Sequence, residues 1–193
     1  DKIGKAVTGF EIGQRVLVVD LDPQGNASTG LGIDADQREY TSYELLLEDI
    51  DLDKVIMQTD VEGVLIVPAT TDLSSADLEL ISNEKRSFLL HDALRQTAMD
   101  GFVFDYILID CPPSLGLLTV NGLTAANEVI VPIQCQYYAL EGLGQLLRNV
   151  DLVSRNLNPG LGVSTIICTM FDTRTKLSSD VVAEVREHFG DKV

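Results

Sequence analysis

A run of apolar residues that ends in two carboxylates constrains the fold of this chain more than any other feature. Residues 16–19 are valine and leucine, and Asp20 and Asp22 follow directly. An unbroken apolar run is typical of a strand buried on both faces of a parallel sheet. Side chains two positions apart in a strand point the same way, and α/β sheets bind ligands at the carboxyl ends of their strands. The segment therefore predicts a buried strand whose end can hold a metal ion and a water.

Apolar runs alternate with segments of helical periodicity along the whole chain. Strands are expected at 15–20, 64–68, 106–110, 128–132 and 163–170. Helices are expected at 1–12, 41–48, 52–58, 73–82, 84–99, 116–126, 139–157 and 178–189, the last capped by Ser178 or Ser179. Strands that alternate with helices imply right-handed crossovers. The predicted fold is therefore α/β, a mostly parallel sheet with helices on both faces.

The composition excludes several classes of protein. The net charge of −16 argues against a domain that binds nucleic acid through an overall basic surface. DNA contact then needs a local basic cluster, a partner or further residues, and the acids otherwise keep a cytosolic protein soluble. We find no 18-residue apolar run and expect no signal peptide. The three cysteines are expected to be reduced thiols. None of them has the spacing of a zinc site.

A second predicted strand also ends in a carboxylate. The apolar residues before Asp110 are followed by Cys-Pro-Pro-Ser114. This is the form of a Walker B strand, whose aspartate holds Mg²⁺, usually through water. A buried strand can also end in an aspartate that only caps a turn. The combination with Asp20 and Asp22 on another strand favours the metal site.

Three motifs closely resemble the ParA/Soj chromosome- and plasmid-partition ATPases, a deviant-Walker P-loop class that also contains MinD. They are Val-Asp-Leu-Asp-Pro-Gln-Gly-Asn-Ala-Ser at 19–28, Ile-Asp-Cys-Pro-Pro-Ser-Leu-Gly at 109–116, and Val-Pro-Ile-Gln-Cys-Gln-Tyr-Tyr-Ala-Leu-Glu-Gly at 131–142. They stand in the family's order and spacing, and residues 169–177 look like the loop after a later strand. The resemblance implies a P-loop NTPase-like three-layer sandwich with ATP and Mg²⁺ as cofactors.

The resemblance also implies roles for individual residues. Asp22 resembles the catalytic acid that orients the attacking water, and Asp22 and Asp110 are the implied metal ligands. The implied cofactor-binding residues are Asp20, Asp110, Pro112, Met170 and Asp172. Residues 112–114 would form the switch that senses the γ-phosphate. Arg174 and Lys176 match a basic loop that makes sequence-independent DNA contacts, which salt weakens strongly.

Simpler interpretations of these residues stay open. Asp20 could merely cap a turn, and Arg174 could be a solvated loop charge. Residues 134–140 resemble the segment that shapes the dimer face in this family, but Gln134, Tyr137 and Tyr138 could instead be core and rim residues. His91 and His188 have no partner acids or cysteines at ligand spacing, and we assign them no chemistry.

The function implied by the resemblance is an ATP-dependent partition switch. Mg·ATP would drive formation of a homodimer that binds DNA non-specifically, and a ParB-like partner would stimulate slow hydrolysis to move plasmid or chromosome cargo. Such a protein would be cytoplasmic, nucleoid-associated and free of membrane. One alternative is a nucleotide-free interaction module. Another is a MinD-like membrane switch, which needs a C-terminal amphipathic helix.

Two parts of the family pattern do not match this sequence. The phosphate loop Lys-Gly-Gly-x-Gly-Lys-Thr-Thr is missing, because residues 1–12 align with the helix after it, where Lys5 would be a surface lysine. Family members also continue beyond residue 193. We therefore expect a single ParA-like ATPase domain over residues 1–193 that is incomplete at both ends. Omitted residues, truncation and natural loss of nucleotide binding are the open explanations.

Overall fold

A computed structural model describes residues 13–96, 102–136 and 139–193. The helix predicted at 1–12, with Lys5, lies outside these residues, as do Tyr137 and Tyr138. The chain forms two compact units, one that ends at Gly122 and one that begins at Leu123. Each unit has a sheet of its own.

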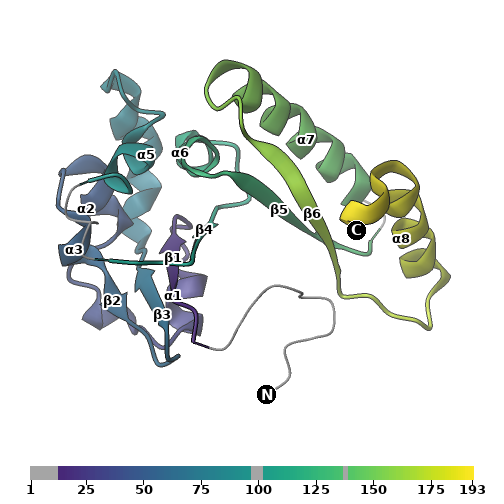
Figure 1. Cartoon of the computed structure of the whole chain (residues 1–193), viewed down its shortest axis with the longest axis horizontal. Coiled ribbons are helices and arrows are strands. Elements are labelled where there is room, and N and C mark those ends of the chain that lie inside the picture. The colour runs from purple at the N-terminus through teal and green to yellow at the C-terminus, as the bar shows by residue number, and fades with distance from the viewer. Residues whose placement is uncertain (1–12, 97–101, 137–138) are drawn as a thin grey trace. The chain divides into compact units, whose positions relative to one another are not determined.

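The first unit is built on a four-stranded sheet (Figure 1). Its strands are β1 (Val16–Asp20), β2 (Met57–Gln58), β3 (Val64–Val67) and β4 (Tyr106–Asp110), in the order β2-β3-β1-β4. β1 runs parallel to both β3 and β4, whereas β2 is antiparallel to β3. The register places Asp20 opposite Asp110. Central β1 buries Leu17 and Val19 completely, whereas Val16 and Val18 on its other face are only partly buried, so the predicted burial on both faces is incomplete.

Short helical segments connect these strands. They are α1 (Asn26–Gly30), α2 (Ser42–Leu47), α3 (Leu52–Val55), α4 (Ala76–Glu79), α5 (Leu89–Ala93) and α6 (Leu117–Ala125), with 3-10 turns at Ala35–Gln37, Thr71–Ser75 and Leu80–Ser82. α2 begins at a capping box in which Thr41 and Glu44 bond each other's backbone N–H groups. The helix predicted at 52–58 is wrong in its second half, because Met57 and Gln58 pair with β3. In the described part of 84–99, the α-helix is confined to α5.

The second unit pairs two parallel strands and covers one face of them with helices. Its elements are β5 (Glu128–Gln134), α7 (Ala139–Asn156), β6 (Gly162–Thr169), α8 (Lys176–Phe189) and a 3-10 turn at Gly190–Lys192. α7 and α8 lie on the same side of the strand pair (Figure 1). The core between them is made of Val131, Ile133, Leu143, Ile166, Val181 and Val185.

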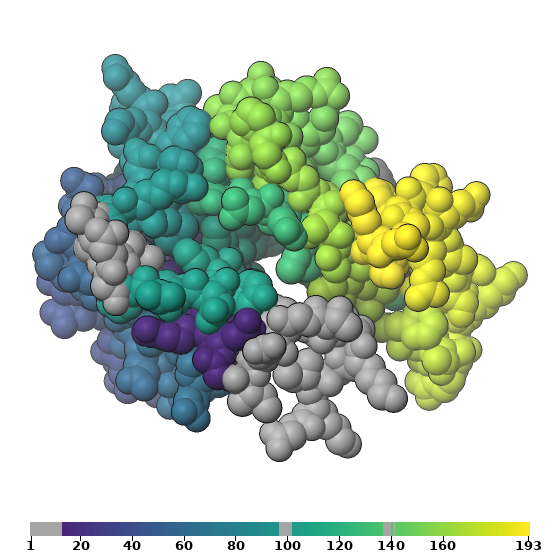
Figure 2. Space-filling view, in the orientation of Figure 1, coloured from purple at the N-terminus to yellow at the C-terminus, as the bar shows by residue number. Residues whose placement is uncertain are grey.

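α8 begins two residues before the predicted helix. Thr175 is its cap, and the hydroxyl oxygen of Thr175 accepts the N–H of Ser178 at 3.4 Å. The prediction of Ser178 or Ser179 as the cap is therefore wrong. Most side chains of α8 are exposed, and they lie on the surface of the second unit (Figure 2).

All five predicted strands are present, and every strand pair except β2–β3 is parallel. The predicted α/β class is therefore confirmed. β4 and β5 each have a single strand neighbour within the described ranges. Some apolar side chains on the faces of these strands are exposed, including Leu108 and Ile130.

Candidate functional site

The turn between β1 and α1 is organised around Asp20. This side chain is completely buried. Its Oδ2 accepts the backbone N–H of Ser28 at 2.9 Å and the hydroxyl of Ser28 at 2.7 Å, while its Oδ1 accepts the N–H of Asp22 at 3.1 Å. Both carboxylate oxygens are therefore used to hold the turn and the start of α1. The Ser42 hydroxyl donates to the backbone carbonyls of Asp20 and Pro68, which ties this strand end to the neighbouring β3.

Asp22 lies in the same turn, with its side chain only partly buried. Its Oδ1 accepts the N–H of Gln24 at 3.0 Å, and its backbone carbonyl accepts the N–H of Gly25 at 2.9 Å. Gly25 has a φ of 61°, which a glycine adopts without strain. No described residue donates a hydrogen bond to Oδ2 of Asp22. One carboxylate oxygen of Asp22 is thus available to a ligand or a water.

Asp110 ends the neighbouring strand, opposite Asp20. Burial raises the pKa of the Asp110 carboxyl, and the negative charges of Asp20 and Asp22 raise it further. The strand ends therefore bring three acidic groups into electrostatic contact. A cation at this edge of the sheet would relieve that repulsion.

A cavity of about 540 Å³ opens beside this turn, wholly within the first unit. It is lined by Asp22, Pro23, Gln24, Asn26, Leu73, Ser74, Asp77, Pro112, Pro113, Ser114 and Leu118. The structure thus brings the predicted catalytic Asp22 and the predicted switch residue Pro112 to one cavity. Asp20 and Asp110 end the two neighbouring strands β1 and β4, and they do not line the cavity. The volume is within the range of small-molecule sites.

Asp77, which the sequence did not indicate as a site residue, lies on α4 and lines the same cavity. Its Oδ1 accepts the N–H of Leu118 in the first turn of α6, at 3.3 Å. Gly116 is adjacent, and a Cβ there would collide with the Asp77 carboxylate. Asp77 therefore caps α6 from another segment of the chain. No local pattern marks it, because the contact joins residues about 40 positions apart.

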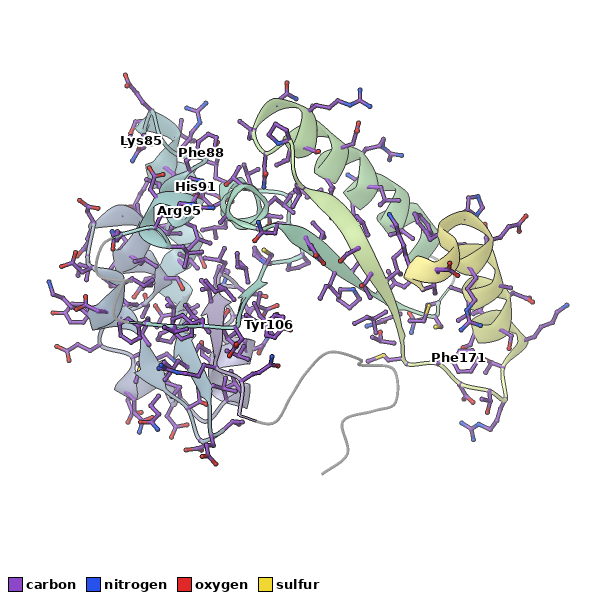
Figure 3. All side chains as sticks on the ribbon, viewed as in Figure 1. Lys85, Phe88, His91, Arg95, Tyr106 and Phe171 are labelled. Atoms are coloured by element: carbon purple, nitrogen blue, oxygen red, sulfur yellow. The ribbon has the colours of Figure 1, made fainter. Side chains whose placement is uncertain are left out.

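The remaining predicted site residues lie in the second unit: Met170, Asp172 and Arg174 in the loop between β6 and α8, and Lys176 at the first position of α8. Figure 3 labels Phe171 in this loop. Met170 is 73% exposed and has a φ of 53°. Asp172 and Arg174 form a bidentate ion pair, with Nη2–Oδ2 and Nε–Oδ1 distances of 2.8 and 3.0 Å. These hydrogen bonds hold the pKa of the Asp172 carboxyl below its usual value, and Lys176 is exposed nearby.

The described residues contain no group of three or more histidine, cysteine, aspartate or glutamate side chains that could hold a metal ion alone. A metal at this site would need ligands besides the protein carboxylates.

Cys111, Cys135 and Cys168 are free thiols, and burial raises the pKa of Cys111 to about 12. Among the described residues, no helix is both long enough and apolar enough to cross a membrane.

Comparison with known proteins gives a consistent result. An AAA domain family matches residues 6–163. The chain is 47% identical to the chromosome partitioning protein ParA of Myxococcus xanthus, over 99% of this chain and 69% of that protein. It is 48% identical to the sporulation initiation inhibitor protein Soj of Bacillus subtilis, over 99% of this chain and 77% of that protein.

Solved structures resemble it as well. A cobyrinic acid a,c-diamide synthase from Mycobacterium smegmatis, solved with a bound ATP analog and magnesium, has a TM-score of 0.83 and 43% identity, over 92% of this chain and 71% of that one. A plasmid partition protein from Borrelia burgdorferi has a TM-score of 0.73 and 26% identity, over 93% and 75%. These likenesses confirm the predicted fold class.

Proposed function

Because this chain belongs to the ParA/Soj family of partition ATPases, we propose that it is an ATP-driven switch whose hydrolytic site is the cavity beside the β1–α1 turn. The observation that carries this proposal is the meeting of Asp22 and residues 112–114 at that cavity. Switch segments must reach the terminal phosphate to report its presence. A turn and a loop from neighbouring strand ends are well placed for this.

The acidic residues fit a magnesium ion. Mg²⁺ usually takes one or two carboxylates together with waters and substrate phosphates, so a cage made only of protein ligands is not needed. Asp22 and Asp110 are the two proposed carboxylates. Burial raises the pKa of Asp110, and the negative charges of Asp20 and Asp22 raise it further. Bound Mg²⁺ would neutralise charge that develops on the phosphates. Its presence in the M. smegmatis structure together with an ATP analog supports the same pair of cofactors here.

Asp22 is proposed to orient the attacking water. The Gln24 N–H holds one carboxylate oxygen in place, and the other oxygen can accept a hydrogen bond from water. Positioning of this kind supplies much of the catalysis in phosphoryl transfer, since the transition state leaves little covalent chemistry to the protein. Asp20 supports the turn from behind with two buried hydrogen bonds to Ser28.

The loop after β4 is proposed to sense the γ-phosphate. The Thr119 hydroxyl donates to the carbonyl of Ser114 at 2.6 Å, which links the loop to α6. Asp77 caps the same helix and lines the same cavity. A movement of Pro112–Ser114 would therefore be passed to α6 through short contacts.

DNA contact is proposed for the loop between β6 and α8. The charge of the chain is unevenly distributed, with eight basic and 22 acidic residues up to position 122, but six basic and eight acidic residues after it. The second unit is therefore nearly neutral. Arg174 and Lys176 lie exposed there, at the start of α8, whose N-terminus favours anions. Met170 and Asp172 of this loop remain proposed cofactor contacts.

The larger cycle follows from the family. ATP would favour a homodimer, the dimer would bind DNA non-specifically, and a ParB-like partner would stimulate hydrolysis and release. The protein would then act on the nucleoid in the cytoplasm. The partition proteins ParA and Soj among its relatives support this cycle more than a MinD-like membrane role.

The test is Asp22→Ala in the full-length protein. ATP binding measured by calorimetry with Mg²⁺ should persist, while phosphate release should fall to background, because the water loses its orienting carboxylate. Unchanged turnover in this variant contradicts the assigned role. Loss of ATP binding together with turnover would instead place Asp22 in nucleotide binding.

A further inference from the structure

Arg38 makes an unusual set of contacts behind the β1–α1 turn. Its Nη1 donates to the carbonyl of Ala69, after β3, at 2.8 Å. Its Nη2 donates to the carbonyl of Ile33 at 2.6 Å and to the Thr29 hydroxyl at 2.8 Å. Within the described residues no carboxylate pairs with it, although the chain has 30 acidic residues. The guanidinium is therefore used as a rigid three-way connector and not as an ion-pair partner.

These contacts reach the turn that carries Asp22. The Thr29 hydroxyl accepts from Arg38 and donates to the carbonyl of Gly25 at 3.1 Å. The N–H of Gly25 in turn donates to the carbonyl of Asp22 at 2.9 Å. A continuous chain of hydrogen bonds thus runs from the guanidinium to the backbone of Asp22.

The packing at Gly25 shows how closely the guanidinium approaches the turn. A Cβ on Gly25 would lie 2.5 Å from Nη1 of Arg38 and 2.9 Å from the Ala69 carbonyl oxygen. Only a residue without a side chain fits between them. Nε of Arg38 is buried and donates to no described residue. The two Nη atoms therefore make all of the hydrogen bonds between the guanidinium and the described residues.

We infer that Arg38 is a positioning residue for hydrolysis: it clamps the β1–α1 turn against the end of β3 and so fixes the carboxylate of Asp22. The inference rests on the proposed role of Asp22. Arginine suits the task because its planar fork donates in two directions at once, whereas the single ammonium of lysine cannot span both sets of acceptors. Arg38 does not line the cavity, so it acts through the turn and not on the nucleotide.

The test compares Arg38→Met and Arg38→Lys with Arg95→Met in the full-length protein. Arg95 is a matched control, because it lies in the same unit (Figure 3) and, among the described residues, donates only to the carbonyl of His91, at 3.0 Å. We expect Arg38→Met to lower kcat about tenfold and to change KM for ATP less than about twofold, since a displacement of ~1 Å can cost up to about 10²-fold in rate. Arg38→Lys should recover only part of kcat, and Arg95→Met should match the unaltered protein.

Thr29→Val gives a second variant in case Arg38→Met does not fold. It removes the link between the guanidinium and Gly25 at an exposed position, and it should lower kcat in the same direction. A wild-type kcat in both Arg38→Met and Thr29→Val, with Asp22→Ala inactive, overturns the role of Arg38 alone. A rise in KM that matches the fall in kcat also overturns it, because Arg38 would then act in binding. Normal turnover in Asp22→Ala overturns the proposed function and this inference together.

Discussion

Asp20 and Asp22 lie two positions apart, yet the β1–α1 turn uses them differently. Asp20 is completely buried, and both of its oxygens accept hydrogen bonds from within the turn. Asp22 keeps one oxygen for a ligand and lines the cavity. The difference arises because the chain turns back after Asp22 and brings Ser28 beneath Asp20. The first carboxylate thus builds the turn that presents the second.

The ion pair between Asp172 and Arg174 leads to a prediction about DNA binding. Phosphate must compete with Asp172 for the guanidinium, so Asp172→Asn should tighten DNA binding. Exposed ion pairs are weak, so we expect an affinity gain of roughly two- to fivefold. The slope of log affinity against log salt concentration should steepen by about the amount that one phosphate contact contributes. Fluorescence anisotropy with a duplex of random sequence at several salt concentrations measures both quantities.

Asp180→Asn is the control for this prediction. Asp180 lies exposed on α8 without an ion-pair partner in the described part of the chain, so its loss changes the net charge equally and releases no arginine. Equal effects of the two substitutions would mean that general electrostatics explains the gain. The pairing of Arg174 with Asp172 would then have no effect on DNA binding.

The candidate site could be predicted from sequence only at residues that follow a predicted strand. Asp22 and Pro112 directly follow strands whose ends must meet in a parallel sheet, and the cavity joins them. Asp77 and Arg38 could not be found, because their contacts with Leu118 and Ala69 depend on how separate segments pack. Residues that position a site leave no periodic signal of their own.

At the scale of elements, α6 approaches the sheet closely through Gly122. A Cβ at this position would lie 2.6 Å from Sγ of Cys111 and 3.3 Å from Cγ2 of Ile109. Gly122→Ala should therefore push α6 away from β4 and lower the free energy of unfolding by about 1–3 kcal/mol, as overpacked cores do. Thermal unfolding followed by circular dichroism measures the change.

Gly142 of α7 supplies the opposite case. A Cβ there meets no atom of the described residues within 4 Å, so Gly142→Ala should stabilise the helix by about 0.5–1 kcal/mol. Both glycines lie inside helices, so helix propensity alone predicts that both substitutions stabilise. Stabilisation by Gly122→Ala would contradict the close packing of α6.

Elements with a strong local pattern could be predicted from sequence, and elements that depend on tertiary pairing could not. β1, β3 and β4 are recognisable apolar runs, and α7 and α8 carry enough periodicity to be recognised. β2 has two residues and exists because it pairs with β3. The helix predicted at 84–99 gives way in its described part to turns and α5, where Asn121 accepts the N–H of Leu90 and donates to the Arg86 carbonyl. Tertiary contacts of this kind override local propensity.

At the scale of the whole molecule, the negative charge disfavours both the folded state and DNA binding. The net charge of −16 repels itself in the folded state, and most of the excess acid lies in the first unit. DNA is also an anion, so contact through Arg174 and Lys176 must overcome the remaining field of the protein. Both effects act between exposed charges, which salt screens over about 10 Å at 0.1 M.

Added sodium chloride should therefore act in opposite directions on the two properties. Screening of self-repulsion should raise the melting temperature, by roughly 2–4 °C for each kcal/mol gained. DNA affinity should fall about tenfold between 50 and 200 mM salt if Arg174 and Lys176 each neutralise one phosphate, because each contact contributes a slope of about −0.9. A neutral osmolyte at equal osmolality is the control, since it leaves charge interactions unscreened. An affinity that does not change with salt would exclude phosphate contact by this loop, whereas an unchanged melting temperature would show that ion pairs offset the acidic excess.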